Sequence, residues 1–184
     1  MTKLARAFLA LAAYTATIVA ANVLTARYGL VPVLPGLLVT AGTYSAGLAL
    51  LARDVVQDVA GRTAAVGAIA GGALVSWWLT DSPELALASG VAFTVGELAD
   101  LLVYTPLRAR SWARAVLASN TVGAVLDSVV FLALAPFPLT VAAVTGQTIG
   151  KVAYATVVPV LLVLAVREVR RRALPLRGAG PRSA

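Results

Sequence analysis

Long apolar runs of about twenty residues follow one another along almost the whole chain, separated by short links that contain charged residues, glycine or proline. Because a helix needs about 20 residues to cross about 30 Å of hydrocarbon, runs of this length are typical of transmembrane helices. The pattern therefore predicts an all-α, polytopic membrane protein with about six such helices, at about residues 4–26, 34–52, 64–80, 85–104, 115–135 and 139–166.

The composition agrees with this prediction. Hydrophobic residues make up 60% of the 184 residues, charged residues 12%, and the mean hydropathy is +0.89, whereas a soluble domain carries about 25% charged residues. We therefore expect a single membrane domain over residues 1–170 and a basic, disordered cytoplasmic tail over residues 171–184. The first run is longer than the apolar core of a cleavable signal peptide, about 7–15 residues, which predicts a retained helix.

The positive charges predict the orientation. With the N-terminus inside, thirteen of the fifteen lysines and arginines fall on the inner side, Arg27 alone falls outside, and Lys151 lies within a run. The positive-inside rule then places both chain ends in the cytoplasm. The net charge of +7 does not indicate nucleic-acid binding, because the arginines are not interleaved with aromatic residues. The group Arg167–Arg172 is expected to contact anionic lipid headgroups.

A few charged and polar side chains interrupt the apolar runs. An ionised group costs at least a few kcal/mol in hydrocarbon, so residues of this kind mark a functional site. Helical spacing places them on one face of the fourth, fifth and sixth helices, where they predict a polar cavity near the midplane that binds a substrate. These candidates are Phe93, Glu97, Asp100 and Tyr104, then Asn120 and Asp127, then Gln147 and Lys151.

The intramembrane charges also have a purely structural interpretation. Asp127 and Lys151 lie at similar depth on neighbouring helices, so they could simply pair, and such a pair is compatible with a binding site. Glu97 and Asp100 lie one helical turn apart and should not both ionise. Glu97 is therefore the candidate for carrying a proton.

Two further features have two interpretations each. Asn22, near the outer end of the first helix, is either a further substrate contact or a helix-end polar group. The charged segment 53–58 is either an interfacial extension with solvated charges or part of an inner gate. In the second case Asp54 would pair with a cation of the loop 108–114, such as Arg108.

The chain contains no histidine and no cysteine. Most metal sites, cysteine nucleophiles and Ser-His-Asp catalysis depend on these residues. We therefore expect no metal, no cofactor and no enzymatic activity.

The order and membrane depth of several short motifs resemble the VUT family of small six-helix prokaryotic membrane proteins. These motifs are Ala21-Asn22, Thr40–Tyr44 leading to Arg53-Asp54 and Gly61, Gly96–Asp100 with Tyr104 and Arg108, Ser119–Thr121 with Gly123 and Asp127-Ser128, and Gln147 with Lys151 and Pro159. The family is vitamin-uptake-like and includes transporters of queuosine precursors. The resemblance implies a multi-pass protein of the prokaryotic plasma membrane that imports a 7-deazaguanine base such as preQ0 or preQ1. Some members carry Gln at the position of Glu97.

The residues permit such a substrate and leave alternatives open. A carboxylate accepts the N1 and 2-amino hydrogens of a guanine-like base, amide side chains serve its other edge, and aromatic rings stack on its face. A homo-oligomer is possible. One alternative is the substrate-binding subunit of an ATP-driven vitamin importer, which would need partners because this chain has no P-loop. Another is an intramembrane lipid-modifying enzyme that would rely on carboxylates and Lys151.

Overall fold

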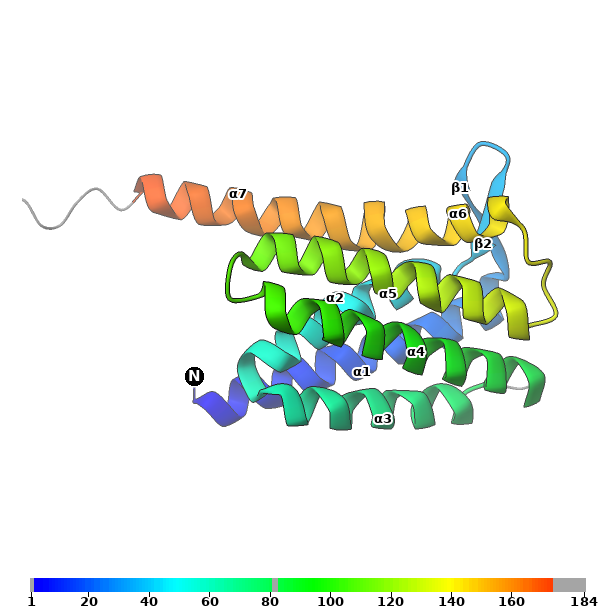
Figure 1. The fold of residues 1–184 in the computed structure, drawn as a ribbon, viewed down its shortest axis with the longest axis horizontal. Coiled ribbons are helices and arrows are strands. Elements are labelled where there is room, and N and C mark those ends of the chain that lie inside the picture. Colours follow the sequence, from blue (N-terminus) through cyan, green and yellow to red (C-terminus); the bar gives the residue numbers. More distant parts are fainter. Residues whose placement is uncertain (1, 81–82, 174–184) are drawn as a thin grey trace, which may run out of the picture.

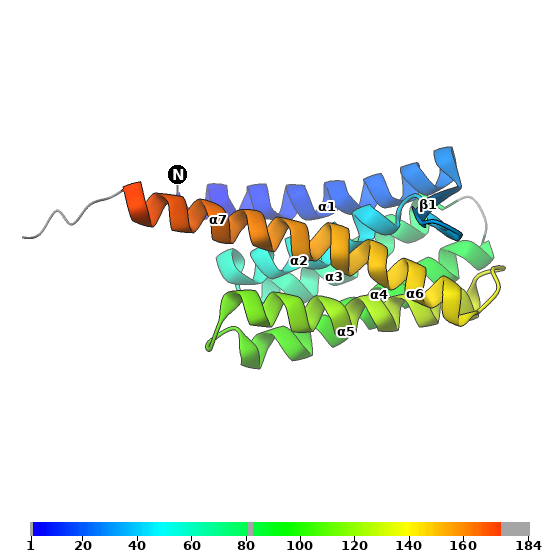
Figure 2. The same cartoon turned by 90° about the horizontal axis from the view of Figure 1, so that it is seen from above.

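The computed structural model describes residues 2–80 and 83–173, and it is a bundle of helices that run along one common direction (Figures 1 and 2). The beginning of α1 and the end of α7 lie at the same end of the bundle, and the β1–β2 hairpin lies at the other end (Figure 1). The elements are α1 (Lys3–Tyr28), β1 (Leu30–Leu34), β2 (Leu37–Thr40), α2 (Thr43–Ala60), α3 (Arg62–Trp78), α4 (Pro83–Leu107), α5 (Trp112–Leu134), α6 (Val141–Ile149), η1 (Gly150–Val157) and α7 (Val158–Ala173).

The helices support a multi-pass membrane protein. Within the described residues, four helices are long and apolar enough to cross a membrane: Lys3–Tyr28, Pro83–Leu107, Trp112–Leu134 and Val141–Arg172. The fourth of these joins α6, η1 and α7 into one continuous helix. Helix α3 has 17 residues, and α2 has 18 residues with three charges among them. The prediction of six spans therefore remains a prediction.

The prediction of a helix over 34–52 is wrong in its first half, so the fold is not wholly α-helical. Strands β1 and β2 pair antiparallel around the turn at Pro35 and Gly36, and Gly36 has φ +79°. Proline followed by a residue with positive φ is the signature of a tight type II turn. The chain reverses here, and the second helix begins only at Thr43 and continues to Ala60.

Two other predicted boundaries differ from the structure. Helix α4 runs through Pro106 to Leu107, past the expected end at residue 104. The predicted tail begins too early, because α7 continues to Ala173 and Glu168 pairs with Arg171 and Arg172 on the same helix. The remainder of the predicted tail, residues 174–184, lies outside the described residues.

Glycines bring α4 and α5 close together at the depth of the buried acids. A Cβ added to Gly96 would lie 2.6 Å from Cβ of Asp127, and one added to Gly123 would lie 2.9 Å from Cβ of Asp100. These separations are too short for any larger residue. The close approach places the acidic side chains of the two helices next to one another.

Candidate functional site

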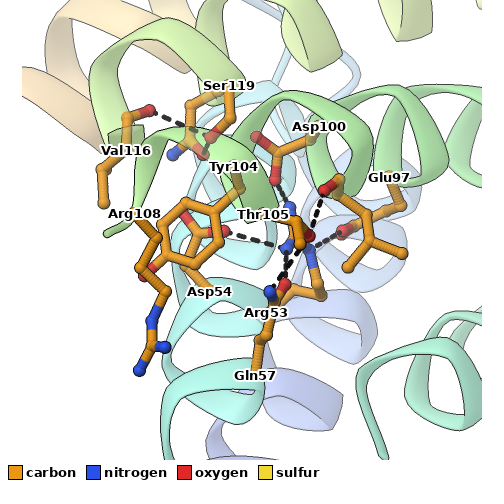
Figure 3. Close-up of polar contacts among 12 residues, drawn as sticks. Arg53, Asp54, Gln57, Glu97, Asp100, Tyr104, Thr105, Arg108, Val116 and Ser119 are labelled. Carbon is orange, nitrogen blue, oxygen red and sulfur yellow. Dashed lines mark hydrogen bonds and ion pairs between the residues drawn. The ribbon is translucent and has the colours of Figure 1, made fainter. Parts of the chain in front are cut away.

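A buried arginine of α2 gathers three carboxylates inside the bundle (Figure 3). Arg53 is fully buried, and it forms ion pairs with Asp54 (Nη1 to Oδ1, 3.0 Å), Glu97 (Nε to Oε2, 3.2 Å) and Asp100. Arg53 also donates a hydrogen bond to Oε1 of Gln57 over 3.1 Å. We call Arg53 and its three carboxylates the Arg53 cluster.

Side chains of the surrounding helices support the Arg53 cluster. Asn120 of α5, in the amide orientation that pairs both of its ends, donates to Asp54 (3.3 Å) and Asp100 (3.2 Å) and accepts from Thr156 of η1 (3.1 Å). Tyr14 of α1 donates to Oε1 of Glu97 over 3.5 Å. The ring of Tyr104 lies 5.6 Å from Cζ of Arg53, within reach of a cation–π interaction.

The expectation that segment 53–58 is a solvated extension is wrong for its first two residues. Arg53 and Asp54 are both 0% exposed. Glu97, which pairs with Arg53, lies 44 positions from it in the chain, so local pattern could not reveal the pairing. One signal was present: the fourth, fifth and sixth apolar runs contain Glu97, Asp100 and Asp127, but only Lys151 as a cation. This excess of acids favours a further buried cation.

A pocket of about 400 Å³ lies on the side of these charges that faces the β1–β2 hairpin. Elements α1 to α6 and the beginning of η1 contribute to it, so it is not confined to the fourth, fifth and sixth predicted helices. Its charged and amide groups are Asn22, Asp127, Gln147 and Lys151; its hydroxyl groups are Thr25, Thr40, Thr43, Ser76, Thr80 and Ser89; its aromatic rings are Phe93, Phe131 and Phe137.

Asp127 and Lys151 form an ion pair in the wall of this pocket. The Lys151 ammonium also donates to Oγ of Ser128 (2.9 Å) and to Oε1 of Gln147 (3.2 Å). Lys151 is 3% exposed, whereas the Asp127 side chain is 18% exposed. Lys151 therefore neutralises the Asp127 carboxylate from its more buried side, and that carboxylate stays accessible to a ligand in the pocket.

Lys151 lies in a π-helical segment, Gly150–Val157. Such segments are rare and frequently occur at functional sites. Helix α2 packs tightly against this π-helical segment, since a Cβ added to Gly47 would lie 2.7 Å from Cα of Lys151. The wider π turn and the adjacent glycine hold the lysine against α5.

The sequence candidates divide between the pocket and the Arg53 cluster. Five of them line the pocket: Asn22, Phe93, Asp127, Gln147 and Lys151. The described residues that line the pocket do not include the other four: Glu97 and Asp100 belong to the Arg53 cluster, and Tyr104 and Asn120 contact it.

The contacts of Asn22 are compatible with both of its interpretations, as a helix-end polar group and as a substrate contact. It accepts a hydrogen bond from Thr80 (3.1 Å) and donates to Ser76 (3.4 Å), which joins α1 to the end of α3. It also lines the pocket.

The predicted pairing of Asp54 with Arg108 is wrong. Arg108 instead pairs with Asp58, which also accepts a hydrogen bond from the Tyr104 hydroxyl over 2.9 Å. Asp54 lies one helical turn deeper, where Arg53 and Asn120 bind it. The contact between α2 and the end of α4 therefore exists, with Asp58 as its acidic partner.

A double-mutant cycle tests whether Lys151 mainly neutralises Asp127. Lys151→Met leaves a partly buried carboxylate without its cation, so we expect a loss of thermal stability in detergent, because breaking a buried pair costs about 3–5 kcal/mol. Adding Asp127→Asn should restore part of the loss. Additive losses in the cycle would show that the two side chains are not coupled.

A bundle of apolar helices around a small, mostly apolar pocket with a few polar groups is typical of a membrane transporter. The profile of one family, described as "Putative vitamin uptake transporter", matches residues 75–166, half of the chain. The chain belongs to this family, which confirms the resemblance to VUT proteins. No curated protein and no solved structure matches it.

Proposed function

We propose that this transporter imports a queuosine precursor, a 7-deazaguanine base such as preQ0 or preQ1, through the pocket at Asp127. The observation that carries the proposal is an accessible carboxylate, fixed by Lys151, in a pocket of about 400 Å³ with aromatic and amide neighbours. This volume is within the range of about 300 to 1,000 Å³ that is usual for small-molecule sites.

The lining groups match the chemistry of a guanine-like base. The Asp127 carboxylate would accept the N1 and 2-amino hydrogens side by side, as carboxylates do with paired donors. Asn22 and Gln147 offer amide groups for the opposite edge, and Phe93 or Phe131 would stack on the ring. Stacking on an aromatic side chain contributes about 1–3 kcal/mol per base. Because the Asp127–Lys151 pair is neutral overall, it suits the uncharged ring system of such a base.

The same proposal includes a direction of access. With both ends of the chain in the cytoplasm, the hairpin end of the bundle faces outward, and the pocket lies beside it. The Arg53 cluster and the Asp58–Arg108 pair then close the inner side. Release into the cytoplasm requires these contacts between α2 and α4 to separate.

Uptake in a prokaryotic strain that cannot synthesise queuosine tests the proposal. Cells that express the protein should accumulate queuosine in their tRNA when preQ0 or preQ1 is supplied, and cells with an empty vector should not. Equal queuosine levels in both strains would contradict the proposal. Co-purification of an ATPase with the active protein would instead identify the binding subunit of an ATP-driven importer.

A further inference from the structure

The Arg53 cluster holds more negative than positive charge in the buried interior of the bundle. Arg53 is its single cation, while Asp54, Glu97 and Asp100 supply three carboxylates, and all four side chains are at most 1% exposed. Ionised groups without compensation are very costly in such surroundings. At least one carboxylate therefore takes up a proton readily in the folded protein.

The contacts of Glu97 differ from those of the two aspartates. Asp54 and Asp100 each combine an ion pair to Arg53 with a hydrogen bond from Asn120. Glu97 has one bond from Arg53 at 3.2 Å and one from Tyr14 at 3.5 Å, which is long for a hydroxyl donor. Glu97 is the one of the three that receives no bond from Asn120, which makes it our candidate for the proton.

The groups that face Glu97 come from every side. Tyr14 lies on α1, Arg53 and Asp54 lie on α2, Asp100 follows one turn later on α4, and the charge of Asp127 acts on it from α5. Lys151 of η1 neutralises Asp127. Protonation of Glu97 therefore changes the electrostatic potential at Asp127 in the pocket as well as inside the Arg53 cluster.

Two contacts connect Glu97 to the pocket, and a third connects the rest of the Arg53 cluster to it. Its neighbour Gly96 packs directly on Asp127. Tyr14 packs against the pocket residue Phe93, with ring centroids 6.3 Å apart. Asn120 links the cluster through Thr156 to η1, the element that carries Lys151. Coupled binding requires two distinct sites whose contacts differ between two states of the protein.

We propose that Glu97 is the proton-binding site of this transporter and that its protonation is coupled to substrate binding at Asp127, so that base and proton enter together. This inference rests on the proposed function. Coupling is reciprocal: a proton on Glu97 tightens substrate binding, and bound substrate favours the proton. Breaking of the Arg53–Glu97 ion pair on protonation also loosens the contact between α2 and α4 that closes the inner side.

The test uses purified protein and proteoliposomes with a pH-sensitive dye inside, and preQ0 as the probe. In the wild type, preQ0 should bind roughly tenfold tighter at acidic than at neutral pH, within the usual range of about 5- to 150-fold for coupled sites. Adding preQ0 outside should acidify the lumen. Glu97→Gln, which resembles the protonated acid, should bind with the tight affinity at both pH values and move no protons.

Glu84→Gln is the matched control, because it makes the same change at an exposed position of the same helix. It should keep the wild-type pH response. Two outcomes would overturn the inference and leave the proposed function intact. One is uptake of preQ0 by the wild type without acidification of the lumen. The other is a normal pH response of preQ0 binding in Glu97→Gln. If the folded wild type binds neither preQ0 nor preQ1, both proposals fail. The wild-type measurements decide the question even if Glu97→Gln does not fold.

Discussion

Arg53→Met is expected to destabilise the protein more than any other single substitution considered for this chain. The change removes the only cation of the Arg53 cluster and leaves Asp54, Glu97 and Asp100 buried together. Leaving buried charge unpaired costs about 3–5 kcal/mol. We expect a large fall in the yield of folded protein and in its unfolding temperature in detergent.

Arg108→Met is the matched control for Arg53→Met. Arg108 also pairs with an aspartate of α2, but its side chain is 45% exposed. Exposed pairs contribute at most about 1 kcal/mol, so this variant should remain close to the wild type. Adding Asp100→Asn to Arg53→Met should recover part of the lost stability. Equal stability of the Arg53→Met and Arg108→Met proteins would contradict the structural account of the cluster.

Asp127→Asn is expected to lower preQ0 uptake at least about tenfold, which corresponds to about 1.4 kcal/mol of binding free energy. Asparagine keeps the size of the side chain but replaces one acceptor oxygen by a donor, so it cannot accept both hydrogens of the guanine-like edge. The rate of uptake into cells and the dissociation constant of purified protein should both change.

Asp58→Asn provides the comparison for the pocket acid, because Asp58 pairs with Arg108 and lies outside the described pocket lining. The dissociation constant of the Asp58→Asn protein for preQ0 should stay within about twofold of the wild-type value. A loss of about 1.4 kcal/mol, as expected for Asp127→Asn, would raise this constant about tenfold. A well-expressed Asp127→Asn protein with wild-type uptake would remove Asp127 from the binding site.

Much of the helical framework could be predicted because apolar run length determines it. The first, third, fourth and fifth predicted helices agree with the structure to within about three residues at each end, the usual scatter of such boundaries. The second helix could not be placed in this way. The run at residues 34–52 is apolar throughout its first half, but Pro35 and Gly36 turn it into a hairpin.

The pocket was easier to predict than the Arg53 cluster. Asp127, Gln147 and Lys151 share a depth on adjacent helices, so their meeting follows from helical spacing and a short connection. Arg53 lies at the end of an apolar run, where a charge usually marks the membrane surface. Only the packing of α2 against α4 and α5 brings it to Glu97 and Asp100, and tertiary packing leaves no local pattern.

Direct binding of four bases to the purified wild-type protein tests the central claim. Calorimetry with preQ0, preQ1, queuine and guanine should give saturable binding of at least one 7-deazaguanine, and Asp127→Asn should weaken that binding about tenfold or more. If the folded protein binds none of the four bases, or if Asp127→Asn binds them as tightly as the wild type, the proposed substrate and site are contradicted.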